Sequence, residues 1–118
     1  MRLSKRRILI TGGGTGVGAD MAKGFAAQGA EVVISGRRAA PLEAVATQAS
    51  GIRAIPADVT SETDVADLFK AAGPVDVVLA NAGASFSTPF GKTSLEDWNA
   101  MMAVNLTGVF LTLRAGLH

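Results

Sequence analysis

The sequence predicts an α/β protein built on a parallel sheet with helices on both faces. Short β-branched or apolar runs alternate with helical repeats, and glycines stand at many of the junctions between them. Strict alternation of strand and helix is typical of parallel sheets, because each helix returns the chain to the same end of the sheet. We expect about four strands, with one further helix after the last of them.

The first half of the chain is expected to contain two strand–helix pairs. Residues 7–11 form a β-branched, apolar run that three glycines stop, and residues 31–35 form a second such run, so both predict strands. A helix is expected at about 16–29, where apolar residues recur at intervals of four. A second helix is expected at about 41–51, because Pro41 suits a first helical turn and a glycine ends the segment.

Two more pairs are expected in the second half. Residues 52–57 predict the third strand and residues 75–80 the fourth, which is apolar enough to be buried on both faces. Between them Ser61 has an acidic residue three positions on, the spacing of a capping box, and an apolar helical stripe follows. After a loop at 81–93, Ser94 is again followed three positions on by an acidic residue, Asp97, which predicts the start of a long helix towards the end of the sequence.

Composition excludes several classes of protein. The 118 residues allow one domain, and 48% hydrophobic against 18% charged residues argues against disorder. A net charge of +1 gives no reason to expect nucleic acid or an anionic membrane as a partner. With no cysteine and one histidine, His118, we expect no metal site and no Ser-His-Asp triad. The longest apolar runs are too short for a signal peptide or a membrane span, so we expect a soluble cytoplasmic protein.

A glycine-rich run, residues 11–18, lies where the first strand turns into the first helix. Glycine permits the backbone angles of a tight turn, lets a pyrophosphate approach the main chain, and lets the helix pack close to the sheet. Unpaired N–H groups at the start of the helix then face the anion. The run lacks the Gly-Lys-Ser/Thr of a Walker-type loop. We predict nucleotide binding at Thr11, Gly12, Gly14, Thr15, Gly16, Val17 and Gly18.

The spacing Thr-Gly-x-x-x-Gly-x-Gly resembles that of the short-chain dehydrogenase/reductase family. Later motifs resemble the same family: Asp58-Val59 after the third strand, Ala80-Asn81-Ala82-Gly83 after the fourth, and Trp98 with the run Val104-Asn105-Leu106-Thr107-Gly108-Val109-Phe110 in the last helix. The second motif has Ala80 where the family has asparagine. The resemblance extends from Arg7 to about Gly116 and implies a Rossmann-like fold.

The resemblance also implies a role for these residues. Asp58 would accept a hydrogen bond from the adenine amino group, and Val59 would supply an apolar contact beside it. Asn81, followed by Ala82 and Gly83, would lie beside the cofactor ribose. Asn105 would belong to the catalytic tetrad and help hold a water that leads to the catalytic lysine. From the residues alone, a helix cap at Asp58, an ordinary turn at Asn81 and a structural amide at Asn105 remain open.

The end of the second strand bears on the choice of cofactor. NAD-preferring members of the family have an acidic residue there, whereas this sequence has Gly36 followed by Arg37 and Arg38. A guanidinium can pair with a 2′-phosphate in a fork geometry. We therefore predict NADP rather than NAD, with Arg37 and Arg38 in the cofactor site. The alternative is that both arginines are solvated loop charges.

The catalytic set of the family is not complete in this sequence. Its other members are a serine and a Tyr-x-x-x-Lys, and the sequence contains no tyrosine. We therefore expect residues 1–118 to form a single, truncated NAD(P)-binding domain, inactive alone, of an NADP-dependent enzyme that acts on a carbonyl or an alcohol. A non-catalytic nucleotide-binding or interaction module, or half of a split reductase, are the alternatives. An uncovered fourth strand and an apolar last helix predict a homo-oligomer or aggregation.

Overall fold

A computed structural model describes residues 2–83 and 88–117 of the chain. Its four strands are β1 Arg7–Thr11, β2 Glu31–Ser35, β3 Ile52–Ala54 and β4 Val77–Leu79. They form one parallel sheet in the order β3-β2-β1-β4. At its centre Leu9 of β1 pairs with Val33 of β2 on one side and with Val78 of β4 on the other. The predicted fold class is confirmed.

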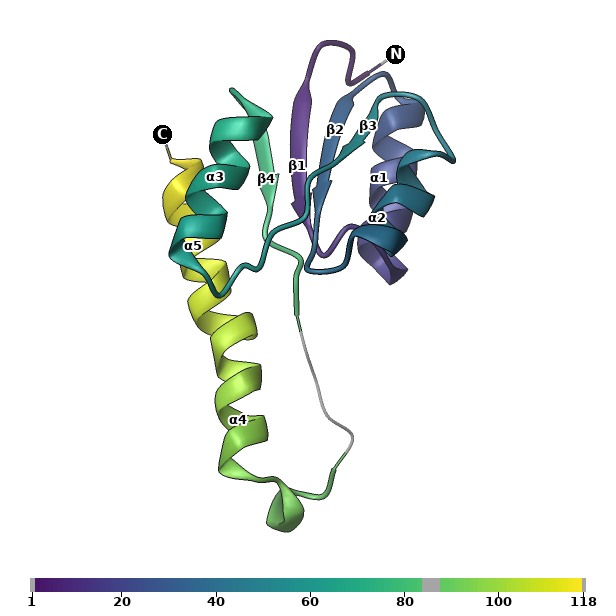
Figure 1. Cartoon of the computed structure of the whole chain (residues 1–118). Coiled ribbons are helices and arrows are strands. Elements are labelled where there is room, and N and C mark those ends of the chain that lie inside the picture. Colours follow the sequence, from purple (N-terminus) through teal and green to yellow (C-terminus); the bar gives the residue numbers. More distant parts are fainter. Residues whose placement is uncertain (1, 84–87, 118) are drawn as a thin grey trace.

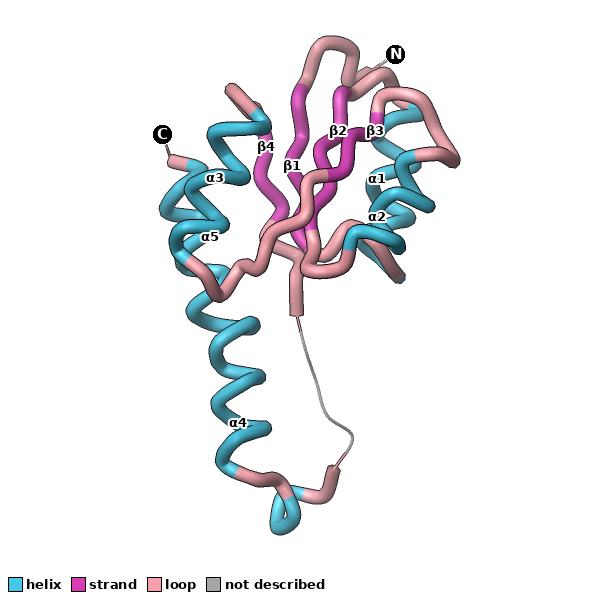
Figure 2. Tube along the Cα trace, viewed as in Figure 1, coloured by secondary structure: helices cyan, strands magenta, loops and turns pink. Residues whose placement is uncertain are grey.

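Helices cover both faces of this sheet (Figures 1 and 2). The first pair is α1 Gly16–Ala27 and α2 Ala39–Ala46, and the opposite face carries α3 Glu62–Ala72 and α5 Val109–Gly116. A short 3₁₀ turn, Phe90–Lys92, precedes α4 Leu95–Met102, and a π-helical segment, Ala103–Gly108, joins α4 to α5. Figure 1 shows that α4 extends away from the sheet, whereas α5 lies beside α3.

Alternating side chains of the strands build the two halves of the core. Ile8 and Ile10 of β1 belong to one buried cluster with Leu42 of α2, whereas Leu9 belongs to a second cluster with Leu68 of α3. Successive residues of a strand point to opposite faces, so an unbroken apolar run is needed where both faces are covered. Burial on both faces therefore explains why β1 and β2 match the predicted ranges residue for residue.

The outer strands are shorter than predicted. β3 ends at Ala54, although the N–H groups of Ile55 and Ala57 still donate to carbonyls at the end of β2. Pro56 lies between them, where the N–H of a residue in a parallel pair points away from the neighbouring strand, so the proline removes no bond to β2. β4 begins at Val77 because the Asp76 carboxylate takes the place of a backbone carbonyl and accepts the N–H of Arg7 at 2.8 Å.

Two of the predicted helices also differ from the structure. α2 begins at Ala39, two residues before the proline, and ends at Ala46, well before Gly51. The last helix has the predicted start, since Ser94 accepts the N–H of Asp97 at 3.0 Å, but its middle is π-helical. The loop predicted at 81–93 contains the 3₁₀ turn, and residues 84–87 within it lie outside the described part of the chain.

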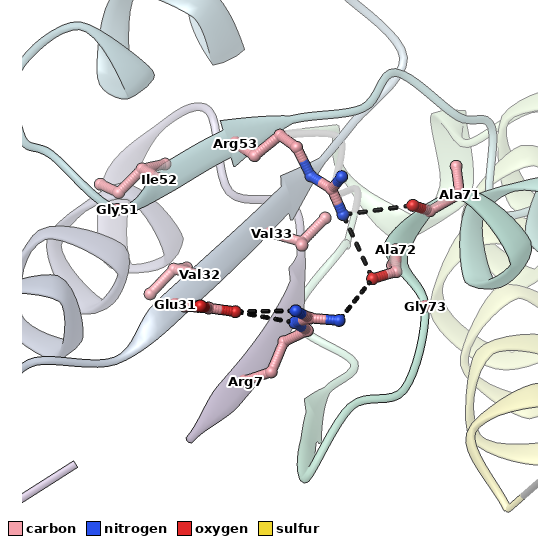
Figure 3. A pocket seen from close by; sticks show the side chains of 10 residues that line it. All are labelled: Arg7, Glu31, Val32, Val33, Gly51, Ile52, Arg53, Ala71, Ala72 and Gly73. Carbon is pink, nitrogen blue, oxygen red and sulfur yellow. Dashed lines mark hydrogen bonds and ion pairs between the residues drawn. The ribbon is translucent and has the colours of Figure 1, made fainter. Parts of the chain in front are cut away.

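Two arginines hold the C-terminus of α3 at the amino ends of the strands (Figure 3). The Arg7 Nη1 donates to the carbonyl of Ala72 at 3.2 Å, and its Nε and Nη2 donate to one oxygen of Glu31 at 3.0 and 2.8 Å. The Arg53 Nη2 donates to the carbonyls of Ala71 and Ala72, each at 3.2 Å. The last carbonyls of a helix have no partner within the helix, and the two guanidinium groups supply donors for them. Both arginines line the pocket drawn in Figure 3, where their side chains are already engaged with the protein itself.

The structure leaves apolar surface uncovered at β4 and along the last helix. β4 is an edge strand of the described sheet, and Val77 is 40% exposed. On the last helix the exposed large apolar side chains are Leu95, Trp98, Leu106, Phe110, Leu113 and Leu117. The predicted edge and apolar helix surface are confirmed, but the expected burial of the fourth strand on both faces is wrong: Val77 is exposed and Val78 and Leu79 are half-buried. The association that these surfaces suggest stays a prediction. None of the helices that the structure describes has the length and apolar character needed to cross a membrane.

Candidate functional site

The glycine-rich run forms the turn between β1 and α1 and lies against the end of β4. Gly12 has φ +66°, a left-handed conformation that favours glycine, and a Cβ there would lie 2.9 Å from the Cα of Ala82. Gly18 is buried, and a Cβ on it would collide with the carbonyl oxygen of Gly12 and with the Asn81 amide. Two of the predicted reasons for glycine, a tight turn and close helix packing, are therefore visible at these positions.

The exposed part of the turn has the features of an anion site. Gly16 has φ +55°, and apart from its chain neighbours and the backbone of α1 no described atom lies within 4 Å of the position its Cβ would take. Thr15, the N-cap of α1, makes no side-chain capping bond within the described chain, and the first turn of α1 has no acidic residue. By contrast, Ser61 caps α3 and Ser94 caps α4. The N-terminus of α1 is thus open to a phosphate, so the residues present fit a dinucleotide.

Thr11 and Asn81 fasten this turn to the chain that leaves β4. The Thr11 hydroxyl accepts the N–H groups of Asn81 and Ala82, both at 3.0 Å, and the Asn81 Nδ2 donates to the carbonyl of Gly12 at 3.2 Å. Thr11 is 1% exposed. Both side chains therefore bind the protein's own backbone, and the contact of Asn81 with a ribose stays a prediction.

Six of the predicted site residues line one pocket of about 160 Å³ at the carboxyl ends of the strands. They are Gly12, Arg37, Asp58, Val59, Ala82 and Gly83. The chain adds β2 and β3 on one side of β1 and then returns to place β4 on the other side. The order of the strands therefore reverses at β1, next to this pocket. In open parallel sheets ligands bind at the carboxyl ends of the strands where that reversal occurs.

Asp58 is held in this pocket by the turn that precedes α3. Its Oδ1 accepts the hydroxyl of Thr60 at 2.6 Å and the N–H of Thr60 at 2.9 Å. These two bonds lower the pKa of Asp58, partial burial opposes them, and the charge of Arg37 lowers the pKa further. The carboxyl group is therefore ionised at neutral pH and can only accept hydrogen bonds.

The helix cap next to Asp58 differs in part from the predicted capping box. Ser61 accepts the N–H of Asp64 at 3.2 Å, as predicted. The Asp64 carboxylate, however, accepts the N–H of Asp58 at 2.9 Å instead of the N–H of Ser61. The N–H of Ser61 donates to the carbonyl of Asp58 at 3.0 Å. The bond between Asp64 and the N–H of Asp58 therefore fixes Asp58 to the first turn of α3.

The two arginines after β2 are placed differently. Both are exposed, but only Arg37 lines the pocket, whereas Arg38 is the N-cap residue of α2. Gly36 also lines the pocket. The nearest atom to a Cβ at Gly36 would be the Leu42 Cδ2, at an ordinary contact distance of 3.6 Å, and its φ is not positive. Local packing therefore does not require a glycine at this position.

Asn105 lies in the π-helical segment of the last helix, near the same edge of the sheet. It is exposed, and its Oδ1 lies 3.3 Å from the position that a Cβ of Gly83 would take. Three residues on, Gly108 packs so closely on the Val59 side chain that a Cβ would approach it to 2.7 Å. The π-helical segment thus meets both Gly83 and Val59, and such segments are frequent at functional sites.

Sequence reasoning missed four residues around the pocket. Gly13 is buried, and a Cβ on it would lie 2.5 Å from the Ile34 Cβ, so the position requires glycine. The run of three successive glycines could have suggested this requirement. Thr60 stands two positions after an aspartate, a spacing typical of a local side-chain turn. Ala57 and Val104 also line the pocket; Val104 begins the motif recognised in the last helix, but neither residue was assigned to the site.

Comparisons with known proteins agree with this geometry. The model of the family described as short chain dehydrogenase matches residues 6–118. The oxidoreductase asL5 of Sarocladium schorii is 41% identical over 98% of this chain and 49% of its own length. The NADP-dependent (R)-specific alcohol dehydrogenase of Lentilactobacillus kefiri is 37% identical over 99% of this chain and 49% of its own length.

A solved structure shares the fold over nearly the whole chain. The 3-ketoacyl-(acyl-carrier-protein) reductase from Brucella melitensis, complexed with NADH, matches with a TM-score of 0.90 and 37% identity, over 94% of this chain and 48% of that one. The chain spans about half the length of the curated relatives it matches. By sequence and by fold, it belongs to the short chain dehydrogenase family.

Proposed function

We propose that the chain is the NADP-binding portion of a short-chain reductase, whose whole reaction is hydride transfer between NADP(H) and a carbonyl or alcohol. The observation that carries the proposal is that Arg37 and Asp58 line the same pocket as Gly12 of the glycine turn. The nicotinamide of a bound cofactor would supply or accept the hydride. The described residues would bind and orient the cofactor.

Each part of the cofactor has a matching set of groups. The pyrophosphate would lie over Thr15, Gly16 and Val17, where the N-terminus of α1 is open. The adenine would lie against Asp58 and Val59, and the ribose near the chain after β4. Asn105, beside Gly83, would take part in the reaction only in a protein that also contains the serine, tyrosine and lysine of the family.

The choice of NADP depends on Arg37 and Gly36. Names of relatives do not decide it, since one is NADP-dependent and a solved structure with the same fold contains NADH. Arg37 can pair with a 2′-phosphate at the rim of the pocket. Gly36 leaves no carboxylate there to repel it, although the space would accept a side chain. A charge-assisted contact of about 1.5–3 kcal/mol corresponds to a preference for NADPH of roughly tenfold to a hundredfold.

Titration with NADPH and NADH, followed by the fluorescence of the reduced nicotinamide, tests this proposal. Arg37→Ala should weaken NADPH binding by roughly tenfold to a hundredfold and leave NADH binding nearly unchanged. Gly36→Asp should move the preference towards NADH. Arg6→Ala, which removes an exposed charge outside the pocket, is the matched control. If Arg37→Ala weakened the affinity for NADPH and for NADH equally, the assignment of Arg37 to the 2′-phosphate would be contradicted.

A second candidate function is an interaction module without nucleotide binding. The exposed apolar side chains of the last helix favour it, because such a surface is typical of protein contacts. A folded chain that binds neither NADPH nor NADH would make this the leading function.

A further inference from the structure

We propose that Thr60 is a positioning residue for recognition of the cofactor's adenine: it holds one carboxylate oxygen of Asp58, so that the other oxygen is presented to the adenine amino group. The inference rests on the proposed function, because it requires a bound dinucleotide whose adenine meets Asp58. It adds a residue outside the motif itself and a mechanism for selecting the base.

Both hydrogen bonds from Thr60 reach the same oxygen. The hydroxyl donates to the Asp58 Oδ1 at 2.6 Å, a length typical of a bond from a hydroxyl to a carboxylate, and the N–H donates to it at 2.9 Å. The terminal torsion of an aspartate is otherwise broad, so two donors on one oxygen fix the plane of the group. The Asp58 Oδ2 accepts no hydrogen bond from any residue that the structure describes. This oxygen is therefore available to a ligand in the pocket.

The backbone around Asp58 is fixed without the Thr60 hydroxyl. The N–H of Asp58 donates to the Asp64 carboxylate at 2.9 Å, and the carbonyl of Asp58 accepts the N–H of Ser61 at 3.0 Å. Asp64 is itself held by Ser61 at the start of α3. Removing the hydroxyl alone should therefore loosen the carboxylate, which keeps only the N–H of residue 60 as a donor, and leave the turn in place.

An oriented carboxylate distinguishes adenine from hypoxanthine. The amino group of adenine donates a hydrogen bond, whereas hypoxanthine has a carbonyl oxygen at that position, which a carboxylate oxygen repels. A site that presents a fixed acceptor rejects a ligand lacking the donor more strongly than a site that can rearrange. The hydroxyl of Thr60 should thus control the preference between the two bases more than overall affinity.

Binding of NADPH and of its hypoxanthine analogue, measured by fluorescence of the reduced nicotinamide, tests the inference. The unchanged chain should prefer the adenine form by roughly tenfold or more. Thr60→Val keeps the backbone N–H, which still donates to Asp58, but lacks the hydroxyl, so the preference should fall by roughly threefold to tenfold. Thr60→Ser, which restores a hydroxyl, should retain the preference. Circular dichroism and thermal unfolding establish that each variant is folded.

A second pair of variants tests orientation directly. In Asp58→Asn, Thr60 should hold the amide oxygen in the position of Oδ1, which leaves the amide nitrogen facing the base. That donor should favour hypoxanthine over adenine, so the preference should invert. In the double variant Asp58→Asn with Thr60→Val only the backbone N–H of residue 60 still orients the amide, so the inversion should become smaller.

The possible results separate this inference from the proposed function. If the chain binds neither dinucleotide, the proposed function fails and the inference fails with it. If it binds NADPH but does not prefer adenine, or if Thr60→Val weakens both forms equally, the proposed function survives and the positioning role of Thr60 is wrong.

Discussion

The hydroxyl of Thr11 accepts the backbone N–H of Asn81 at 3.0 Å, which joins the end of β1 to the chain that leaves β4. The same oxygen accepts the N–H of Ala82 at 3.0 Å, and the amide of Asn81 returns to the carbonyl of Gly12. A single buried threonine thus supplies the acceptor for two successive N–H groups outside any strand. The glycine turn is thus fixed to the chain after β4 on one side, and on the other side Thr15 and Gly16 remain exposed to a ligand.

Thr11→Val should destabilise the chain. The substitution keeps the shape of the side chain but leaves the N–H of Ala82 without its acceptor, at a cost of about 1–3 kcal/mol, whereas the N–H of Asn81 keeps the carbonyl of Leu79 at 2.9 Å. Thr11→Ser keeps the oxygen and should retain most of the free energy of unfolding. Urea unfolding of the three proteins measures the difference. Equal midpoints for Thr11→Val and the unchanged chain would show that these bonds contribute little.

Two glycines of α1 should respond in opposite directions to alanine. At Gly18 the added methyl would meet the Gly12 carbonyl, so the helix must shift, which costs about 1–3 kcal/mol. At Gly24, apart from its chain neighbours and the backbone of the helix itself, no described atom lies within 4 Å of the new Cβ, and alanine should stabilise the helix by up to about 1 kcal/mol. Thermal unfolding of both variants makes the comparison. A loss of stability in Gly24→Ala as large as in Gly18→Ala would mean that helix packing is not the cause.

Much of the fold could be predicted because local patterns determine it. β1 and β2 are buried on both faces, and their ends match the apolar runs. The cap at Ser61 follows from a spacing of three residues. By contrast, β3 ends at Ala54 within the apolar run that predicted it, although hydrogen bonds towards the second strand continue beyond it. The choice of the Asp64 carboxylate for the Asp58 N–H depends on the path of the preceding loop.

The residues of the candidate site could be predicted where they belong to sequence motifs. Gly12, Arg37 and Asp58 come from three different junctions, and the structure brings them to one pocket. Thr11, predicted from the same motif, lies buried beneath the turn, and burial is a property of the packed sheet that no spacing reveals. Val104 belongs to a motif of the last helix, but its place in the pocket depends on how that helix packs and not on the spacing of the motif.

The contribution of Asp58 to stability should depend on pH. Because its pKa in the folded chain is lowered from the ordinary value of 3.8, chiefly by Thr60, the unfolded chain binds the proton more tightly. The stabilisation is therefore fully present above about pH 5 and is lost as the pH falls through 3.8 towards the lower folded value.

Urea unfolding of the unchanged chain and of Asp58→Asn between pH 2.5 and pH 7, roughly the range over which a lowered carboxyl pKa acts, tests this. The difference between their free energies of unfolding should be constant near neutral pH and should shrink on acidification. A difference that stays constant down to the lowest pH, or grows there, would contradict a lowered pKa.

The uncovered face of the last helix should make the chain associate with itself. Trp98 is 49% exposed on α4, and Leu106 and Phe110 add apolar surface further along the same helix. Trp98→Glu places a charge in this surface and should shift the chain towards the monomer in sedimentation velocity experiments, because apolar contact drives such association. Asn99→Glu adds the same charge at an exposed polar neighbour and should leave the association unchanged. An unchanged chain that sediments as one monomeric species at every concentration and melts cooperatively would show that the apolar face does not mediate self-association.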